Sequence, residues 1–157
     1  MNAACKNVMV SLATAASLGF AQAAAGQTCP TSHGSGTVIN ADAHYATVGG
    51  GLNNAISAVD TDFGVVAGGE GNDLLIGDHS AICGGHDNST AAGFSFVGGG
   101  FSNDAAGTHS VIGGGSNNGV GAAGTSGVIA GGTGNIVAGD NSAVGGGAFN
   151  QANGAQS

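Results

Sequence analysis

Positive charge is almost missing from this sequence of 157 residues, which contains one Lys or Arg against nine Asp or Glu. The single cation is Lys6, so the chain beyond it has nine acids, no strong base and a formal charge of −9. A surface without cations cannot neutralise phosphates, which excludes nucleic acid as a partner and disfavours binding to anionic lipid. Charged residues make up only 6% and Pro occurs once, so the composition is neither that of a disordered chain nor that of collagen.

Cysteine is scarce as well, with three residues in the whole sequence. No CxxC pair and no Cys/His cluster with zinc spacing is present, so we expect neither a metal site nor a cofactor. Two cysteines, Cys29 and Cys83, follow the N-terminal apolar segment. Either they form one disulfide in an oxidising compartment, or Cys83 is a small buried residue.

The N-terminal residues have the pattern of an export signal. Lys6 precedes an apolar segment that is too short and too interrupted to span a membrane, and Ala21-Gln22-Ala23 has the small-x-small form of a cleavage site. We therefore expect a signal peptide over 1–23, no membrane span in this chain, and a mature protein that is either secreted or held at the cell surface or outer membrane.

What the sequence does contain is glycine, with 34 residues arranged in a repeat. Seven segments of the form [SGA]-x-[VI]-[GAC]-G-G-x-x-N align without gaps, as in SVIGGGSNN at 110–118, and successive closing asparagines lie 15 to 18 residues apart. The repeated residues are Gly50, Gly51 and Asn54; Gly68, Gly69 and Asn72; Gly84, Gly85 and Asn88; Gly99, Gly100 and Asn103; Gly114, Gly115 and Asn118; Gly131, Gly132 and Asn135; and Gly146, Gly147 and Asn150. Such a period indicates a solenoid.

Each position of the repeat has a structural interpretation. The third position is always Val or Ile and the second is mostly apolar, which predicts a strand that is covered on both faces. The Gly pair permits a tight turn, and the Asn predicts hydrogen bonds to neighbouring backbone and a ladder from coil to coil. We therefore predict an all-β parallel β-roll of about seven 15-residue coils over 44–157, preceded by a capping segment over 24–43.

One face of such a strand fills the coil interior, and the other needs a covering layer that a single thin solenoid cannot supply. The repeat S-x-[VI]-G-G-G-x-x-N-x-A-x-G over 44–157 resembles the head repeats of trimeric autotransporter adhesins, the YadA-like family, most closely at 109–117 and 141–157. That resemblance implies a left-handed roll, a homotrimer whose packing covers the apolar face, and attachment to an extracellular protein or a cell surface.

The stalk and anchor segments of that family are not found here, and Ser157 would open a further strand. We therefore expect the head-like domain to be incomplete at its C-terminus. The basic residues that some heads use for ligand contact have no counterpart in this chain.

A second column precedes the repeat at Tyr45, Phe63, His79, Phe94, His109, Ser126 and Asn141. We expect it to share a strand face with the second repeat position. Its aromatic and histidine members then stack along one side, either as a ligand-contact stripe that includes His79, Phe94 and His109 or as packing between subunits. Leu52, Glu70, His86, Phe101 and Phe149 are expected on exposed turns.

Two other functions share parts of this pattern. Residues 68–78 resemble a calcium-binding RTX repeat, but the true period is not nine, and only Asp73 and Asp104 follow the repeat Asn, on coils that are not adjacent. An ice-binding solenoid shares the low charge and the flat faces, but no column is rich in Thr, and the variable spacing predicts imperfect registers. The acids lie singly on turns and no nucleophile has a catalytic context, so we expect no enzyme.

Overall fold

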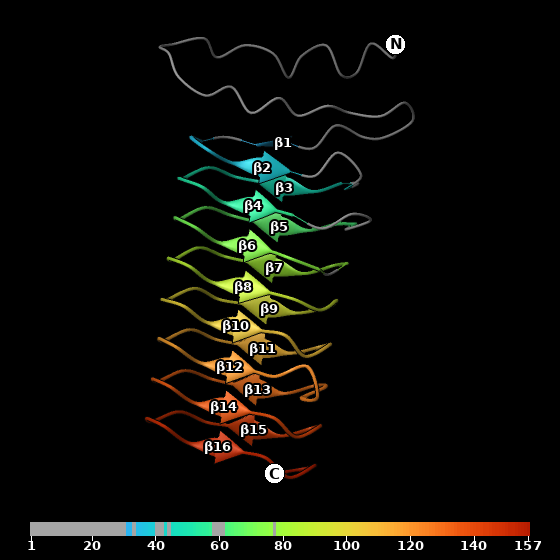
Figure 1. Ribbon diagram of the computed structural model, residues 1–157, viewed down its shortest axis with the longest axis vertical. Coiled ribbons are helices and arrows are strands. Elements are labelled where there is room, and N and C mark those ends of the chain that lie inside the picture. The colour runs from blue at the N-terminus through green and yellow to red at the C-terminus, as the bar shows by residue number, and fades with distance from the viewer. Residues whose placement is uncertain (1–30, 33, 40–42, 44, 58–61, 77) are drawn as a thin grey trace.

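The computed structural model describes residues 31–32, 34–39, 43, 45–57, 62–76 and 78–157. The predicted signal peptide (1–23) and Cys29 lie outside these residues. The described chain contains sixteen two-residue β-strands and no helix, and it winds into a single column of stacked coils (Figure 1). The predicted all-β parallel β-solenoid is confirmed.

The strands form two parallel sheets that run the length of the column, with eight strands each. The odd sheet consists of β1 (Thr31–Ser32), β3 (Thr47–Val48), β5 (Val65–Val66), β7 (Ala81–Ile82), β9 (Phe96–Val97), β11 (Val111–Ile112), β13 (Val128–Ile129) and β15 (Ala143–Val144). The even sheet consists of β2 (Val38–Ile39), β4 (Ala55–Ile56), β6 (Asp73–Leu74), β8 (Ser89–Thr90), β10 (Asp104–Ala105), β12 (Gly119–Val120), β14 (Ile136–Val137) and β16 (Gln151–Ala152).

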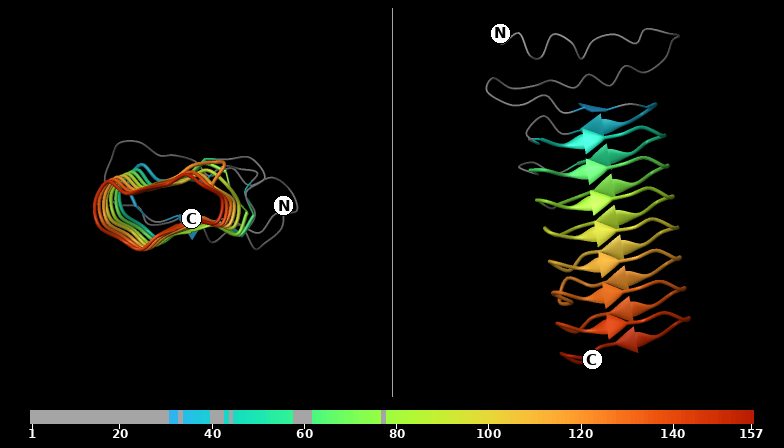
Figure 2. Two further views of the ribbon diagram at one scale, coloured as in Figure 1. Left: turned by 90° about the horizontal axis from the view of Figure 1, so that it is seen from below. Right: turned by 180° about the vertical axis from the view of Figure 1, so that it is seen from behind.

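The strands β1 and β2 fall within the predicted capping segment, and they pair in parallel with β3 and β4. The solenoid therefore already includes this degenerate coil, which lacks the Gly pair. Seen along the column, the coils superpose into a flattened ring whose long sides are the two sheets (Figure 2).

Equivalent repeat positions face each other throughout both sheets. Val111 pairs with Val128 although the two residues are 17 apart, just as Ala81 pairs with Phe96 at a separation of 15. The expectation that variable spacing disturbs the register is therefore wrong. From β3 onward, the connection from each odd strand to the next even strand has six residues, whereas the return connection from β4 onward varies between five and eight, so in these coils only the return turn absorbs the extra residues.

The longest described return turn shows how the extra residues fit. Between β12 and β13, Gly124 donates a backbone hydrogen bond to Gly121 and Gly127 donates one to Gly124, at 2.8 and 2.9 Å. Two consecutive small turns therefore take up the additional length. The chain re-enters the odd sheet in register, as the pairing of β13 with β11 shows.

From β2 onward, the interior is filled by the second residue of each strand. In the odd sheet these residues are Val48, Val66, Ile82, Val97, Ile112, Ile129 and Val144, and in the even sheet they are Ile39, Ile56, Leu74, Thr90, Ala105, Val120, Val137 and Ala152. All are at most 8% exposed. Burying a Val, Leu or Ile side chain contributes about 1.5–3 kcal/mol, so this double row is the main source of stability.

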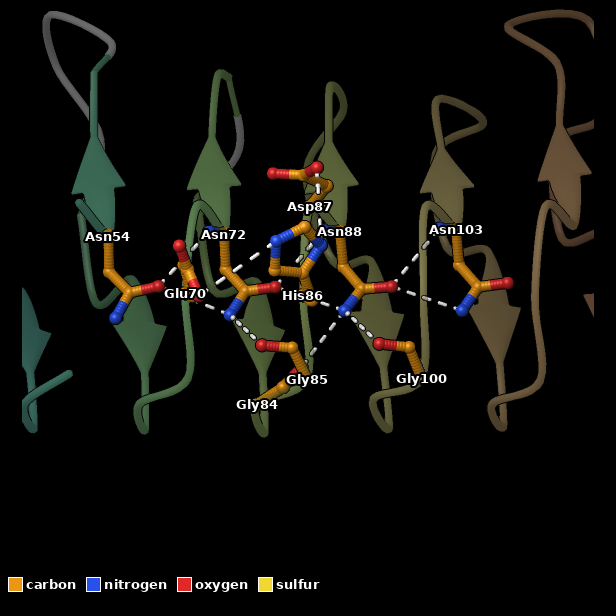
Figure 3. A network of polar contacts seen from close by, with 10 residues as sticks. All are labelled: Asn54, Glu70, Asn72, Gly84, Gly85, His86, Asp87, Asn88, Gly100 and Asn103. Carbon is orange, nitrogen blue, oxygen red and sulfur yellow. Dashed lines mark hydrogen bonds and ion pairs between the residues drawn. The ribbon is translucent and has the colours of Figure 1, made fainter. Parts of the chain in front are cut away.

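The repeat asparagines form a continuous ladder inside the column (Figure 3). The Oδ1 atom of Asn88 accepts hydrogen bonds from the backbone amide and from Nδ2 of Asn103, both at 3.0 Å. The Nδ2 atom of Asn88 lies within hydrogen-bond distance of Asn72 Oδ1, Gly84 O and Gly100 O, at 3.0 to 3.1 Å. The ladder predicted from the sequence is present, and its members from Asn54 to Asn135 are fully buried.

The second Gly of each pair is required by the close stacking of coils. Gly100 has φ of +96°, and a Cβ atom built on it would collide with the carbonyl oxygen of Gly115 in the next coil. A side chain there is excluded by both the backbone conformation and the neighbouring backbone. This explains why the position is Gly in all seven copies.

Candidate functional site

The outward residues of the odd sheet form an uncharged apolar face. They are Thr47, Val65, Ala81, Phe96, Val111, Val128 and Ala143, from β3 to β15. Val65, Phe96 and Val128 remain 38 to 39% exposed in the single chain. The two-residue alternation predicted for these strands is confirmed, with one side chain inside the coil and the other on the surface. We call this row the apolar face.

The outward residues of the even sheet are more polar. Asp73 and Asp104 lie on β6 and β10 and accept hydrogen bonds from the hydroxyl groups of Ser57 and Ser89, at 2.6 and 2.8 Å. The strand β8 separates the two carboxylates, so they do not converge on one point. Within the described residues, no group of three or more His, Cys, Asp or Glu side chains could hold a metal ion.

Cys83 lies two residues after Ala81 and therefore points to the same side as the apolar face. Its side chain is exposed, so the alternative that it is a small buried residue is wrong. Its neighbours in the adjacent strands are small, namely Ala67 and Gly98, which keeps this part of the face flat. Because Cys29 lies outside the described residues, the disulfide stays a prediction.

The turns that precede β3, β5, β7, β9 and β11 carry five stacked rings, which we call the aromatic stripe. They are Tyr45, Phe63, His79, Phe94 and His109. Ring centroids of successive members lie 4.8, 4.8, 5.1 and 5.0 Å apart. His79, Phe94 and His109, the predicted contact residues, are brought together here as consecutive rungs.

The backbone of the stripe differs from the expectation. These residues do not continue the strands, because each one has a left-handed backbone with φ between 55° and 58°. Tyr45, Phe63 and Phe94 are 57, 47 and 52% exposed. The stripe is therefore a row of turn residues on the surface.

A second cluster lies on the opposite connection, where Glu70, His86 and Phe101 occupy the same repeat position in successive coils. His86 stacks on Phe101 with a centroid distance of 5.3 Å. Its Nε2 atom lies 3.9 Å from Glu70 Oε2, and its Nδ1 atom lies 3.2 Å from Asp87 Oδ2 without the geometry of a hydrogen bond (Figure 3). The sequence analysis placed these residues on exposed turns but did not predict that they contact one another. Their shared repeat position was the signal that could have shown it.

The exposed rings, the uncharged face and the hydrogen-bonded carboxylates offer apolar area and scattered polar atoms. No helical segment of the described chain has the length and hydrophobicity needed to cross a bilayer. No protein-family model and no curated protein matches this sequence.

Proposed function

We propose that this chain is an exported, non-catalytic adhesin-like head module that assembles as a homotrimer and attaches to host or neighbouring cells. The proposal combines the solenoid fold with the resemblance of the repeat to the heads of trimeric autotransporter adhesins. It places the protein at the cell surface or outer membrane, or secreted. A left-handed winding of the roll belongs to the same proposal.

The observation that carries the proposal is the apolar face. It continues over seven strands without a charged side chain, and Val65, Phe96 and Val128 are more than one-third exposed. Contiguous apolar surfaces of this kind mark interaction sites in soluble proteins. Two further copies of the chain are the partners that the resemblance implies, and they would remove this face from water.

The exposed turns then remain as the attachment surface. Leu52, Phe101 and Phe149 are 42, 47 and 80% exposed on the turns between odd and even strands. A rod that presents such residues on several coils can make several weak contacts, and trimerisation multiplies them through effective concentration.

Attachment can be tested with beads coated with the purified protein and offered to bacterial and mammalian cells. Coated beads are expected to adhere to at least one cell type, whereas beads coated with the Val128→Asp variant should adhere poorly because its apolar face no longer packs. Equal and negligible adhesion of both coatings to all the cells would contradict the proposal.

Ice binding is a second candidate, favoured by the regular register of the apolar face. Parallel pairing holds equivalent residues such as Val111 and Val128 opposite each other in successive strands. The face contains one Thr, Thr47, among seven positions, which argues against it. A thermal hysteresis assay distinguishes the two, because an adhesin head should produce no hysteresis.

A further inference from the structure

The aromatic stripe has a backbone conformation that bulky side chains disfavour. A left-handed φ is uncommon for any residue other than Gly, and for aromatic residues it indicates strain or function. In the later coils the same turn is occupied by Ser126, Asn141 and Gln156, with φ of 58°, 52° and 61°. The turn can therefore be built without a ring, and the fold does not require aromatic residues at this position.

The rings do not fill the core either. Tyr45, Phe63 and Phe94 leave about half of their surface open to water, at 57, 47 and 52%. Stacking between neighbouring rings contributes only about 0.5–1.5 kcal/mol per pair. A row of half-exposed rings on a strained turn is thus better suited to binding than to stabilising the coil.

The chemistry of the stripe alternates along the column. Tyr45, His79 and His109 carry a hydroxyl or imidazole nitrogens, and Phe63 and Phe94 between them are wholly apolar. Each rung lies 4.8 to 5.1 Å from the next, so polar atoms recur at every second rung. A matching ligand is linear, advances by about one rung per unit, and reverses its orientation at each unit.

Charge and spacing narrow the class of ligand. The chain beyond Lys6 has no strong cation, so a polyanion is excluded. An extended peptide repeats every two residues, or about 6.6–6.8 Å, and falls out of step with the rungs. A polyproline helix repeats at about 9.3 Å, close to two rungs, but proline offers no N–H donor to the hydroxyl and imidazole groups of the stripe.

We propose that the aromatic stripe binds a neutral β-1,4-linked polysaccharide that lies along the rod. In such a polymer each sugar advances by nearly one rung and is turned over relative to the last. Because each ring face is covered by its neighbours in the stack, the apolar C–H groups of the sugars would contact the outward edges of Phe63 and Phe94, and their hydroxyls would bond to Tyr45, His79 and His109. This inference names a ligand class for the proposed attachment function. It rests on that function because the subunits of the proposed trimer pack through the apolar face, which leaves the stripe outside the subunit contact.

The inference is tested by depletion binding to microcrystalline cellulose and to chitin particles, with granular starch as the α-linked comparison. The variants are Phe63→Asn with Phe94→Asn, since Asn141 already tolerates this turn. The matched control is Ile76→Ala, which removes a 62% exposed apolar side chain outside the stripe and introduces the residue found at the aligned position of the next coil, Ala92. Circular dichroism verifies the fold of each variant.

The wild-type protein should be retained on cellulose, chitin or both, and not on starch. The double variant should bind about tenfold more weakly because two aromatic contacts are lost, and Ile76→Ala should bind like the wild type. An extended stripe, made with Ser126→Phe and Asn141→Phe, should bind more tightly, and this arm does not depend on the folding of the double variant.

Three results would overturn the inference: no retention on either β-linked polymer, no gain from the extended stripe, or binding of a proline-rich peptide in place of the polysaccharides. A trimer that attaches to cells but is not retained on the polymers would refute this inference alone. A monomer that is retained on them and fails to attach to cells would refute the adhesin proposal and leave the stripe as a polysaccharide site.

Discussion

The side-chain oxygen of Asn118 accepts two hydrogen bonds from Asn135, one from the backbone amide at 3.0 Å and one from Nδ2 at 3.2 Å. The same pair of bonds links each repeat Asn to the next, so every coil supplies acceptors for the following coil. Buried amides are tolerated only when they are hydrogen-bonded, and here the bonds also set the spacing of the coils. The ladder thus couples the register of the solenoid to its stability.

Replacing Asn118 by Asp should strongly destabilise the solenoid. The substitution keeps the shape but removes the Nδ2 donor, which now bonds to Asn103 Oδ1, Gly114 O and Gly132 O at 3.0 to 3.1 Å. We expect the free energy of unfolding to fall by about 3 kcal/mol or more, since a buried carboxylate would face three acceptors. Urea denaturation followed by circular dichroism measures the change.

The adjacent residue is a matched control for this substitution. Asn117 is exposed and has φ of 54°, and Asp87 occupies the equivalent turn in another coil with φ of 55°. Asn117→Asp should therefore change stability by no more than about 0.5 kcal/mol. Equal losses for the two variants would show that the charge, rather than the ladder, is responsible.

Gly115→Ala should be among the most damaging single substitutions. The added Cβ would meet the carbonyl oxygen of Gly132, and φ of +92° is unfavourable for Ala. We expect a loss of about 4 kcal/mol or more, or failure to fold. Gly119→Ala is the comparison, because a Cβ there meets nothing within 4 Å and Ala55 fills the same position in another coil. Thermal melts that place both variants at the same midpoint would refute the stacking argument.

Thr90→Val should stabilise the protein. Thr90 points into the core at 0% exposure, and its hydroxyl has no hydrogen-bond partner in the described structure. Valine keeps the shape and removes a desolvated polar atom, for an expected gain of about 1 kcal/mol. Calorimetry should show a higher melting temperature, whereas the exposed Thr133→Val should leave it unchanged. A lower melting temperature for Thr90→Val would indicate that the hydroxyl is satisfied in solution.

Val128→Asp and Ile136→Asp test which sheet packs against other copies. The two side chains are 39 and 40% exposed, on the odd and the even sheet respectively. If the apolar face is the subunit contact, Val128→Asp should dissociate the assembly, because a charge would be buried there without a partner. Ile136→Asp should leave it intact. Light scattering gives the masses, and dissociation by Ile136→Asp alone would assign the contact to the even sheet.

Much of this fold could be predicted because each structural position recurs in seven copies of the repeat. The apolar second and third positions predicted strands with one face in the interior, and the structure buries the third position in Val48 and its equivalents. The Asn and the second Gly are forced by contacts between coils, so the sequence cannot vary there. Positions under such constraint are readable without a structure.

The return turn could be predicted less well. Its length varies from β4 onward between five and eight residues, and its left-handed residue is aromatic in some coils and Ser or Asn in others. No single residue type at this position predicts a left-handed turn, so Phe94 was expected on a strand face. The meeting of His86 with Glu70 and Phe101 was missed for a related reason, because the repeat sets the position and the ring contacts depend on side-chain geometry.

Sedimentation velocity on residues 24–157 tests the proposed assembly most directly. We expect one species with three times the mass of the chain, in which neighbouring copies cover Val65, Phe96 and Val128. A single species with the mass of one chain, folded by circular dichroism and with these side chains open to water, would contradict it.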